Sequence, residues 1–306
     1  MVFLRAPMNQ SALRGYLFVV IAAMLWSTIG LLVRVLHDEY GLPALTLAFL
    51  RAGVAAIIAL GVLVLARRDQ LRVTRRGLGL FVVYGVIGIG AFYWLYANAI
   101  IQTSVTMAVV LLYTAPAFVT LIAWRVWGDA LDARKLGALA LAFGGCALVA
   151  RAYDPAQLSL NLIGILFGLG AGFTYALFTI FSKMIVERYS PWTALTYELL
   201  FGALFLAPLQ TRDAFAPLLT HPQTWLFLLG LAFGPTLGAI WFFTAGLRSV
   251  PASNASIVAT IEPAMASVLA FVILGERLEV LQMIGGGMVI GGAVWLNAGG
   301  SRQVDQ

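Results

Sequence analysis

Charged residues, histidine and cysteine are scarce in this sequence. Only 10% of its 306 residues are Asp, Glu, Lys or Arg, whereas about 25% is usual for soluble proteins. Two histidines and one cysteine, Cys146 inside an apolar run, leave no basis for a disulfide framework, a thiolate metal cluster or a His-x-x-x-His site. The remainder is 61% hydrophobic, with a mean hydropathy of +0.94. These values exclude an ordinary water-soluble fold and indicate a membrane protein.

Motifs for several other activities are absent as well. The 19 basic residues outnumber the 13 acidic ones, but nucleic-acid binders carry their basic face on a soluble fold, so no nucleic-acid partner is expected. Neither lysine follows a phosphate-binding Gly-x-x-x-x-Gly pattern, which argues against direct use of ATP. A Gly-x-Ser-x-Gly nucleophile motif and a pair of intramembrane aspartates are also missing. We expect no enzymatic activity, no metal and no cofactor.

Ten apolar stretches have about the 20 residues that a helix needs to cross the hydrocarbon core of a bilayer. They are residues 15–36, 43–65, 78–98, 104–124, 135–150, 162–183, 192–210, 224–247, 254–274 and 280–297. Period-two alternation is missing, which excludes a transmembrane β-barrel. No small-residue cleavage site follows the first stretch, so it is expected to stay in the mature protein. The prediction is an all-α membrane protein with ten transmembrane helices joined by short loops.

Basic residues in the connecting segments favour one orientation. If the N-terminus is cytoplasmic, only Arg34, Arg151, Arg212 and Arg277 lie outside. The residues that then lie inside are Arg5, Arg14, Arg67, Arg68, Arg72, Arg75, Arg76, Arg125, Arg134, Lys135, Lys183, Arg188, Arg248 and Arg302. Because cytoplasmic loops carry the excess of Lys and Arg, we expect a multi-pass protein of the cell inner (plasma) membrane with both termini in the cytoplasm.

The second half of the chain repeats the first at an offset of 147 residues. Trp94 matches Trp241, Pro116 matches Pro263, and residues 144–145 match 291–292 as Gly-Gly pairs. Each half contains five spans, an odd number, so the second half must enter the membrane from the opposite side. Such inverted repeats are typical of secondary transporters that work by alternating access. We therefore divide the chain into repeats 1–150 and 151–306, each with five helices.

Interruptions at matched positions point to the transport pathway. Pro116 and Pro263 fall near mid-membrane in their spans, and a proline there leaves a backbone carbonyl to be satisfied by neighbours or by a water-filled cavity. Paired interruptions in the two halves indicate the solute site of a transporter. A kink that serves only helix packing is the alternative. We assign both prolines a kinking or gating role.

Glycine and aromatic residues gather in the third and eighth spans. Residues 85–90 and 234–238 are rich in glycine and precede the aromatic runs 92–96 and 241–243. Some of these rings are expected at the headgroup level, and the others could line a cavity for aromatic or large apolar groups. Glycines also recur every four residues at 164–172 and at 230–238, which predicts close helix contacts within or between chains and leaves the oligomeric state open.

Three charged residues fall deep inside spans. Glu262 precedes Pro263, and we weigh a proton-coupling or amine-binding carboxylate against a buried carboxyl that caps the freed backbone. Arg51 and Glu198 occupy corresponding positions of the second and seventh spans. The favoured interpretation is a structural ion pair between them. The alternative is that Arg51 attracts the carboxylate of a substrate.

The residues at the ends of the two repeats resemble a known family. Gly128-Asp129-Ala130-Leu131 and Gly275-Glu276-Arg277-Leu278 each precede a glycine-rich last helix. Together with Trp26-Ser27, Arg51 and Glu262-Pro263, they are similar to the drug/metabolite transporter superfamily in its ten-span EamA branch, over nearly the whole chain. The first half departs from the pattern at Asp129 and Ala130, where Glu and Arg are usual, and at Ala115, which replaces an acid.

Within that branch, the aromatic third and eighth spans resemble YddG-type exporters of aromatic amino acids. The resemblance implies a central cavity that binds a small solute between spans of both halves in a lipid bilayer. The implied substrate-binding residues are Trp26, Tyr93, Tyr96, Asn98, Tyr113, Tyr175, Trp241, Asn254, Thr260 and Glu262. The function expected from it is export of amino acids, aromatic and other apolar ones included. The alternative is export of lipophilic drugs or other small metabolites.

Overall fold

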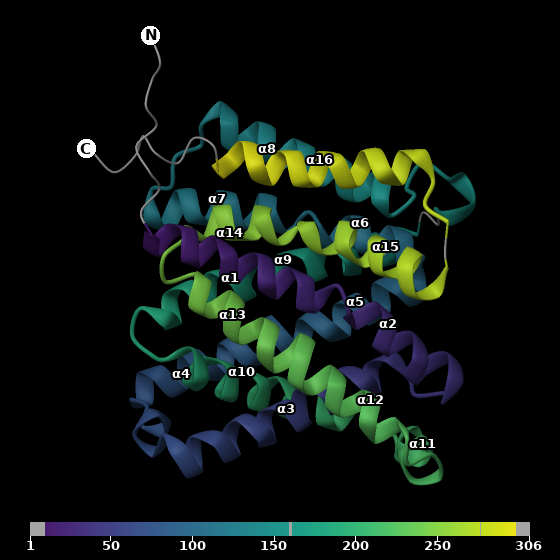
Figure 1. The fold of residues 1–306 in the computed structure, drawn as a ribbon. Coiled ribbons are helices and arrows are strands. Elements are labelled where there is room, and N and C mark those ends of the chain that lie inside the picture. The colour runs from purple at the N-terminus through teal and green to yellow at the C-terminus, as the bar shows by residue number, and fades with distance from the viewer. Residues whose placement is uncertain (1–9, 159–160, 276, 298–306) are drawn as a thin grey trace.

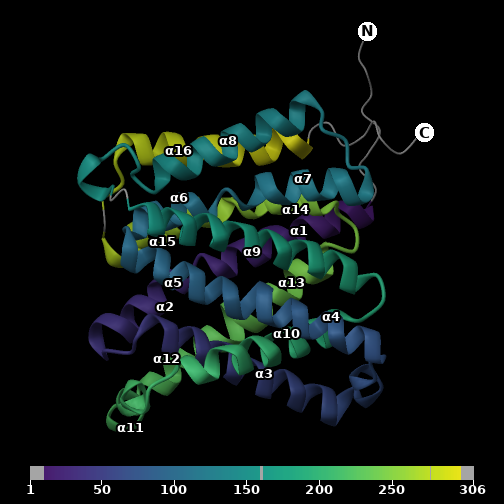
Figure 2. The same ribbon diagram turned by 180° about the vertical axis from the view of Figure 1, so that it is seen from behind.

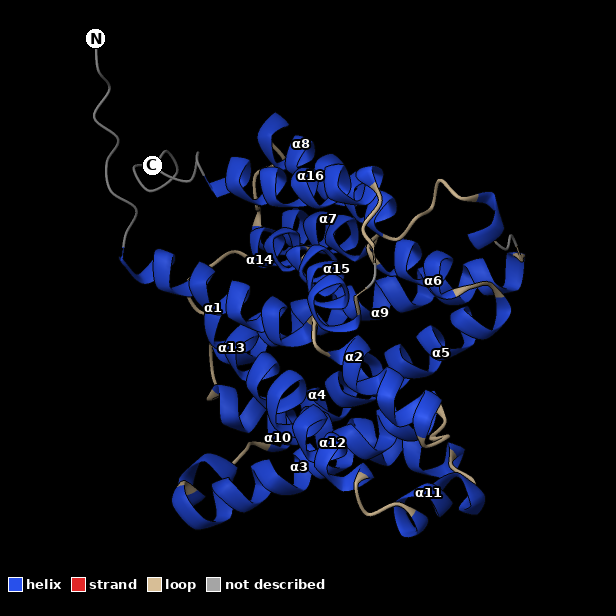
Figure 3. Ribbon diagram, turned by 45° about the vertical axis from the view of Figure 1, so that its right-hand side comes forward, coloured by secondary structure: helices blue, strands red, loops and turns tan. Residues whose placement is uncertain are grey.

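The computed structural model describes residues 10–158, 161–275 and 277–297. Throughout these ranges the regular elements are helices and no strand occurs, as Figure 3 shows. Three residues used in the sequence analysis, Arg5, Glu276 and Arg302, lie outside the described residues. The all-helical fold expected from the composition is therefore confirmed.

Each of the ten predicted spans corresponds to one helical segment of the described chain (Figure 1). The first half contains α1 (Gln10–Trp26), α2 (Ile29–Arg34) and η1 (Val35–Glu39), then α3 (Ala44–Ala66), α4 (Arg75–Gly85), η3 (Val86–Ala91), α5 (Phe92–Gln102), α6 (Val105–Leu112), α7 (Ala115–Trp127) and α8 (Ala133–Val149). The second half contains α9 (Leu162–Val186), α10 (Pro191–Leu206), α12 (Thr224–Leu231), η7 (Ala232–Gly238), α13 (Ala239–Gly246), α14 (Ala252–Ala259), α15 (Ile261–Leu274) and α16 (Val280–Asn297). Short connecting helices are η2 (Arg68–Leu71), η4 (Pro155–Gln157), η5 (Ala207–Leu209), η6 (Arg212–Phe215) and α11 (Ala216–Thr220).

Within the described ranges, eight helical stretches are long and apolar enough to cross a membrane. The last helix of each half is shorter: α8 has 17 residues and α16 has 18. These two helices lie side by side along one edge of the bundle in Figures 1 and 2, and they share the most extensive contact between any two elements. The fold is thus a ten-span inverted repeat of two five-helix halves.

The two halves exchange their first helices. Helix α1 packs against α13, α14 and α15 of the second half, whereas α9 packs against α5, α6 and α7 of the first. The second helices, α3 and α10, pack against each other. Because each first helix packs between helices of the other half, the main hydrophobic core contains residues of both halves. The interrupted helices α6–α7 and α14–α15 lie near one another (Figure 1).

Glycines allow the backbones of α8 and α16 to touch. A Cβ atom added to Gly145 would lie 2.6 Å from the carbonyl oxygen of Gly285, and one added to Gly285 would lie 2.7 Å from the carbonyl oxygen of Gly145. These distances are shorter than any normal contact, so only glycine fits at either position. Of the two matched Gly-Gly pairs, Gly145 lies in this contact and Gly292 lies against Ala138 of α8, whereas a Cβ atom added to Gly291 would meet nothing within 4 Å.

This contact gives a stability prediction with a control on the same helix. Gly285→Val should reduce the free energy of unfolding by about 1–3 kcal/mol, because the added side chain forces the two backbones apart. Gly287→Val should leave stability unchanged, since a Cβ atom there meets nothing within 4 Å. Thermal unfolding of the purified variants in detergent measures both effects. Equal unfolding temperatures for the two variants would contradict the assignment of this contact.

The two predicted glycine rows have different outcomes. Gly164, Gly168 and Gly172 of α9 lie against α5 and α6, where an added Cβ atom would collide with Thr103, Leu111 or Thr114. That prediction is confirmed. In the second row, a Cβ atom added to Gly230 or Gly234 meets nothing within 4 Å, so these two glycines make no close contact within the described chain. The π-helical turn of η7 lies inside this row, and its wider turn removes the four-residue register on which the prediction depended.

Candidate functional site

Two interrupted helices meet in the middle of the bundle. Helix α6 ends at Leu112 and α7 begins at Ala115, with Pro116 in its first turn. Helix α14 ends at Ala259 and α15 begins at Ile261, with Pro263 in its first turn. A threonine hydroxyl donates to a carbonyl oxygen at each interruption, from Thr114 to Leu111 and from Thr260 to Ile257, both at 2.6 Å.

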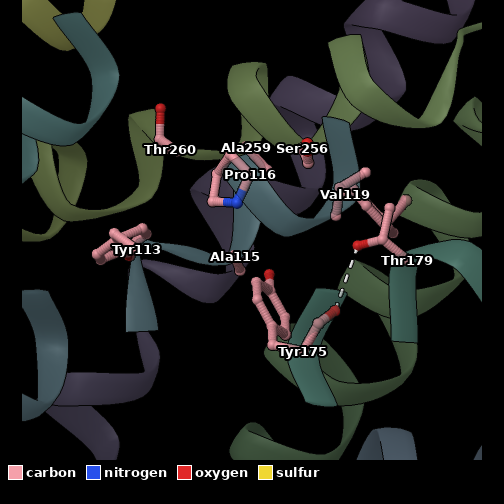
Figure 4. A pocket seen from close by; sticks show the side chains of 10 residues that line it. Tyr113, Ala115, Pro116, Val119, Tyr175, Thr179, Ser256, Ala259 and Thr260 are labelled. Carbon is pink, nitrogen blue, oxygen red and sulfur yellow. Dashed lines mark hydrogen bonds between the residues drawn. The ribbon is translucent and has the colours of Figure 1, made fainter. Parts of the chain in front are cut away.

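A small cavity lies between these interruptions, as Figure 4 shows. It is lined by Tyr113, Ala115, Pro116, Val119, Tyr175, Thr179, Phe243, Ser256, Ala259 and Thr260. Its volume is about 10 Å³, which is room for about one water molecule. The hydroxyl of Tyr175 points toward Ala115 in Figure 4, and Thr179 Oγ1 donates to the Tyr175 carbonyl oxygen at 3.5 Å. This space, called the central cavity below, is therefore closed to any larger solute in this conformation.

Aromatic rings form one wall of the central cavity. The Tyr175 ring is stacked on Phe178, with centroids 5.8 Å apart, and packs on Phe92 at 5.2 Å. Trp26 from α1 contacts the same cluster, at 6.4 Å from Tyr175 and 5.1 Å from Phe243. The wall thus combines rings from both halves of the chain and offers flat surfaces for a planar apolar group.

Glu262 supplies negative charge beside this wall. Its carboxyl interacts electrostatically with Tyr96, Tyr113 and Tyr175, and with the guanidinium of Arg51. The side chain is half-buried rather than fully enclosed, although it belongs to the first turn of α15 in the middle of its span. A carboxyl that lies near tyrosine rings and is not fully buried can bind a cationic group.

The ion pair expected between Arg51 and Glu198 does not form, so that prediction is wrong. The Arg51 guanidinium carbon lies 4.9 Å above the centre of the Tyr93 ring. Arg51 Nε and both carboxyl oxygens of Glu198 are buried and have no hydrogen-bond partner. A cation over an aromatic face is stabilised by the ring quadrupole, and this contact holds Arg51 on Tyr93 instead of on Glu198.

The sequence-predicted binding residues divide into two groups. The structure brings Trp26, Tyr113, Tyr175 and Thr260 to the central cavity or its aromatic wall, with Tyr96 and Glu262 beside them and Tyr93 under Arg51. The remaining residues, Asn98, Trp241 and Asn254, lie in other surroundings.

Local contacts explain where those three side chains lie. Asn98 Nδ2 donates to the carbonyl oxygen of Trp94 on its own helix, at 2.8 Å. Asn254 Nδ2 donates to the hydroxyl of Tyr16 at 2.9 Å. The ring of Trp241 packs on Phe18 with centroids 6.0 Å apart. Each of the three residues thus belongs to a neighbouring contact rather than to the central cavity.

Several cavity residues are absent from the predicted binding set. Thr179 of α9, Ser256 of α14 and Phe243 of α13 line the central cavity, and Phe178 supports its wall. Phe243 is the last residue of the aromatic run 241–243. The sequence indicates that run, but the predicted binding set contains Trp241 from it instead of Phe243. Ser256 is one of several neutral polar residues of the ninth span, and Thr179 resembles an ordinary polar residue of a buried helix, so neither entered the predicted binding set.

Polar contacts close the predicted cytoplasmic end of the bundle. Ser253 at the start of α14 donates to Asp129 at 2.6 Å and accepts from Lys135 Nζ at 3.1 Å. Lys183 Nζ, at the end of α9, donates to the carbonyl oxygen of Leu247 at 2.6 Å. The Ser253 contacts join α14 to α8 and to the segment after α7 across the boundary between the halves, and the Lys183 contact joins α9 to the end of α13 within the second half.

Loss of the Lys135 contact is expected to loosen this end. Lys135→Met removes a charged hydrogen-bond donor. We expect roughly tenfold faster labelling of a cysteine placed at Ser256, which corresponds to about 1.4 kcal/mol in the equilibrium that opens this end of the bundle. The labelling is measured in a Cys146→Ala background, because the native thiol is the single cysteine of the chain. Arg134→Met, one residue away, is the matched control and should label at the unmodified rate. Equal rates in all three proteins would contradict a closing role for Lys135.

A groove opens at the predicted outer end. It lies between α1–α2 and α15–α16 and has a volume of about 350 Å³, within the size range of small-molecule sites. Its lining residues are Ser27, Gly30, Leu31, Arg34, Arg151, Ala266, Ser267, Ala270, Leu274, Arg277, Leu278 and Gln282. Ser27 follows Trp26 of the aromatic wall, and Ser267 donates to the Pro263 carbonyl oxygen at 3.1 Å. The groove is thus lined in part by residues of α15, the helix whose first turn carries Glu262 and Pro263.

Comparison with known proteins identifies the family of this chain. The EamA-like transporter family matches residues 13–151 and, a second time, residues 162–298. A solved crystal structure superposes on 93% of this chain and 96% of its own chain, with a TM-score of 0.76 and 16% sequence identity. That superposition shows the shared fold.

Two relatives cover nearly all of the chain. An uncharacterized transporter of Archaeoglobus fulgidus is 31% identical over 280 residues, which are 92% of this chain and 95% of the relative. A probable terminal-alkyne amino-acid exporter of Streptantibioticus cattleyicolor is 28% identical over 284 residues, which are 91% of each chain. Both relatives are named as transporters, and each matches this chain over nearly its whole length.

Proposed function

Because the chain belongs to the EamA-like transporter family, we propose that it is a secondary transporter that exports amino acids, including aromatic and other apolar ones. In this proposal it works by alternating access in the cell inner membrane, with both termini in the cytoplasm. The repeats 1–150 and 151–306 are the two halves that move relative to each other. The solute binds where their interrupted helices meet.

The observation that carries this proposal is the arrangement around the central cavity. Glu262 provides a carboxylate for the ammonium group, and the rings of Trp26 and Tyr175 provide a surface for an aromatic or aliphatic side chain. The helices α7 and α15 begin at the cavity, and such half-helix N-termini in transporters attract anionic groups of substrates. The three parts of an amino acid thus each find a matching surface.

The two ends of the bundle support alternating access. The predicted cytoplasmic end is joined by the Asp129, Lys135 and Ser253 contacts, and the predicted outer end opens in a groove. The central cavity between them holds about one water molecule. A solute can therefore enter only when the interrupted helices separate, and Pro116 and Pro263 lie where that movement would begin.

One relative supports the substrate class. The protein of Streptantibioticus cattleyicolor that matches 91% of this chain is named a probable terminal-alkyne amino-acid exporter. An unusual amino acid with an apolar side chain is consistent with the aromatic wall described above. The name belongs to that relative, and the substrate of this chain is the proposal made here.

Transport by the purified protein tests the proposal. Liposomes that contain the protein are loaded with labelled phenylalanine, leucine or aspartate, and efflux is measured against protein-free liposomes. We expect saturable efflux of phenylalanine and leucine, and little efflux of aspartate, whose second carboxylate would face the aromatic wall in place of an apolar side chain. Failure to release any amino acid, together with saturable release of a lipophilic cationic dye, would instead favour a drug exporter.

A further inference from the structure

Charge is unbalanced in the middle of the described bundle. Away from the two ends of the described bundle, the side chains that can carry a full charge are Arg51 on α3, Glu198 on α10 and Glu262 on α15. Arg51 is 8% exposed and Glu198 is 0% exposed. A single guanidinium can neutralise one of the two carboxyls at a time, so the other must be protonated or must meet another cation.

Glu198 is the carboxyl that has no partner. Both of its oxygens are buried without a hydrogen bond, whereas Glu262 is half-buried and interacts with Arg51. Tyr84, a neighbour of Glu198, shares a 2.6 Å hydrogen bond with Ser182 Oγ, in which either hydroxyl can donate, and also interacts with the Glu198 carboxyl. A fully buried carboxylate without a partner is strongly disfavoured, while the neutral acid is tolerated.

Charged and titratable groups on the elements packed against α10 are few. They are Arg51 on α3, Arg68 and Asp69 on η2, Arg75, Arg76 and Tyr84 on α4, and Tyr175 and Lys183 on α9. Those that interact with Glu198 are Tyr84 and, from α5, Tyr93. Tyr93 also carries the Arg51 guanidinium over its ring at 4.9 Å, so the same residue contacts the cation and interacts with the unpartnered carboxyl.

We propose that Glu198 is the proton-binding residue of the transport cycle and that its ionisation draws Arg51 away from Glu262. While Glu198 is a neutral acid, Arg51 rests on Tyr93 and its charge acts on Glu262, where it competes with the ammonium group of a substrate. When the Glu198 carboxyl releases its proton to water, the resulting carboxylate attracts the guanidinium. Glu262 is then free to bind the ammonium group.

This scheme rests on the proposed function and makes it proton-coupled. The proton on Glu198 and the substrate at Glu262 are bound alternately. Arg51 acts on Glu262 when Glu198 is protonated and on Glu198 when Glu198 is ionised. Such competition is what an exchange of one proton for one substrate molecule requires. The conformation described here, with a closed central cavity and an unpartnered Glu198, corresponds to the protonated state without substrate.

The pH dependence of the transport KM tests the proposal in proteoliposomes. In the unmodified protein, the KM for phenylalanine should rise as the pH falls, since protonated Glu198 leaves Arg51 beside Glu262. Glu198→Gln should give the high KM of acidic pH at every pH and should abolish accumulation driven by a pH gradient. Arg51→Met should also remove the pH dependence, but at the low KM. A pH-dependent KM in Glu198→Gln would overturn the proposal.

A second measurement does not require transport. Infrared difference spectra of the purified protein at neutral pH should contain the carbonyl stretch of a protonated carboxylic acid, and Glu198→Gln should remove it while Glu262→Gln leaves it. Absence of that band from the unmodified protein would overturn the proposal whatever the substrate is. If the band is present and no amino acid is transported, the proposed function fails and the proton-binding role of Glu198 stands.

Discussion

Replacing Glu262 by glutamine should reduce amino-acid export roughly 100-fold, which corresponds to about 2.7 kcal/mol. The change keeps the size of the side chain and removes the charge that the ammonium group would meet among Tyr96, Tyr113 and Tyr175. A charge-assisted hydrogen bond in a site shielded from water has this magnitude. Initial rates of labelled phenylalanine efflux from liposomes, at matched protein content, measure the loss.

Glu39→Gln is the control for this prediction. Glu39 ends η1 and is exposed, so its replacement changes the net charge of the protein equally without reaching the central cavity. Its efflux rate should equal that of the unmodified protein. Efflux by Glu262→Gln within the error of this control would show that Glu262 is a buried carboxyl that serves only the proline-interrupted backbone.

The double variant Pro116→Ala, Pro263→Ala should be more stable than the natural sequence and yet nearly inactive. Alanine supplies the N–H group that proline lacks, so α6–α7 and α14–α15 could each continue as one helix. Both prolines lie in the first turn of their helices, where proline is tolerated, so the gain in stability comes from the backbone hydrogen bonds that continuous α6–α7 and α14–α15 helices would add. We expect a higher unfolding temperature together with a loss of phenylalanine exchange of tenfold or more, about 1.4 kcal/mol.

The opposite signs of these two effects are the test. Ordinary damage to a protein lowers stability and activity together, whereas removal of a hinge raises one and lowers the other. Pro217→Ala, in the short connecting helix α11, is the matched control and should leave exchange unchanged. Retention of full exchange by the double variant would remove the two prolines from the mechanism.

The arrangement of helices could be predicted in detail from the sequence. The hydrocarbon thickness sets the length of a span, so hydropathy alone located all ten, including the short fifth one that became α8. The 147-residue offset pairs Pro116 with Pro263. Each proline interrupts its own helix, so the two helix interruptions could be predicted from the sequence. The glycine-rich stretches 85–90 and 234–238 became the π-helical turns η3 and η7. Local backbone chemistry is readable in these cases.

Side-chain partners across the bundle were not readable in the same way. Arg51 and Glu198 match in depth, but depth along a span says nothing about rotation around its axis, and Arg51 lies on Tyr93 instead. The same ambiguity separates Trp241, on Phe18, from Phe243, at the central cavity. A helix that is apolar on all sides has no amphipathic face that would fix its rotation. Which of its rings point inward depends on its neighbours.

The exchange of first helices between the halves has a consequence for biosynthesis. The seat that α5, α6 and α7 build for α9 stays empty until Val186 has left the ribosome, and α1 waits longer still, until α15 is complete at Leu274. Neither half can therefore finish its own interior while the chain is being made. Final assembly must follow insertion of almost the entire polypeptide, and a truncated product would expose unfilled seats to lipid or to other nascent chains.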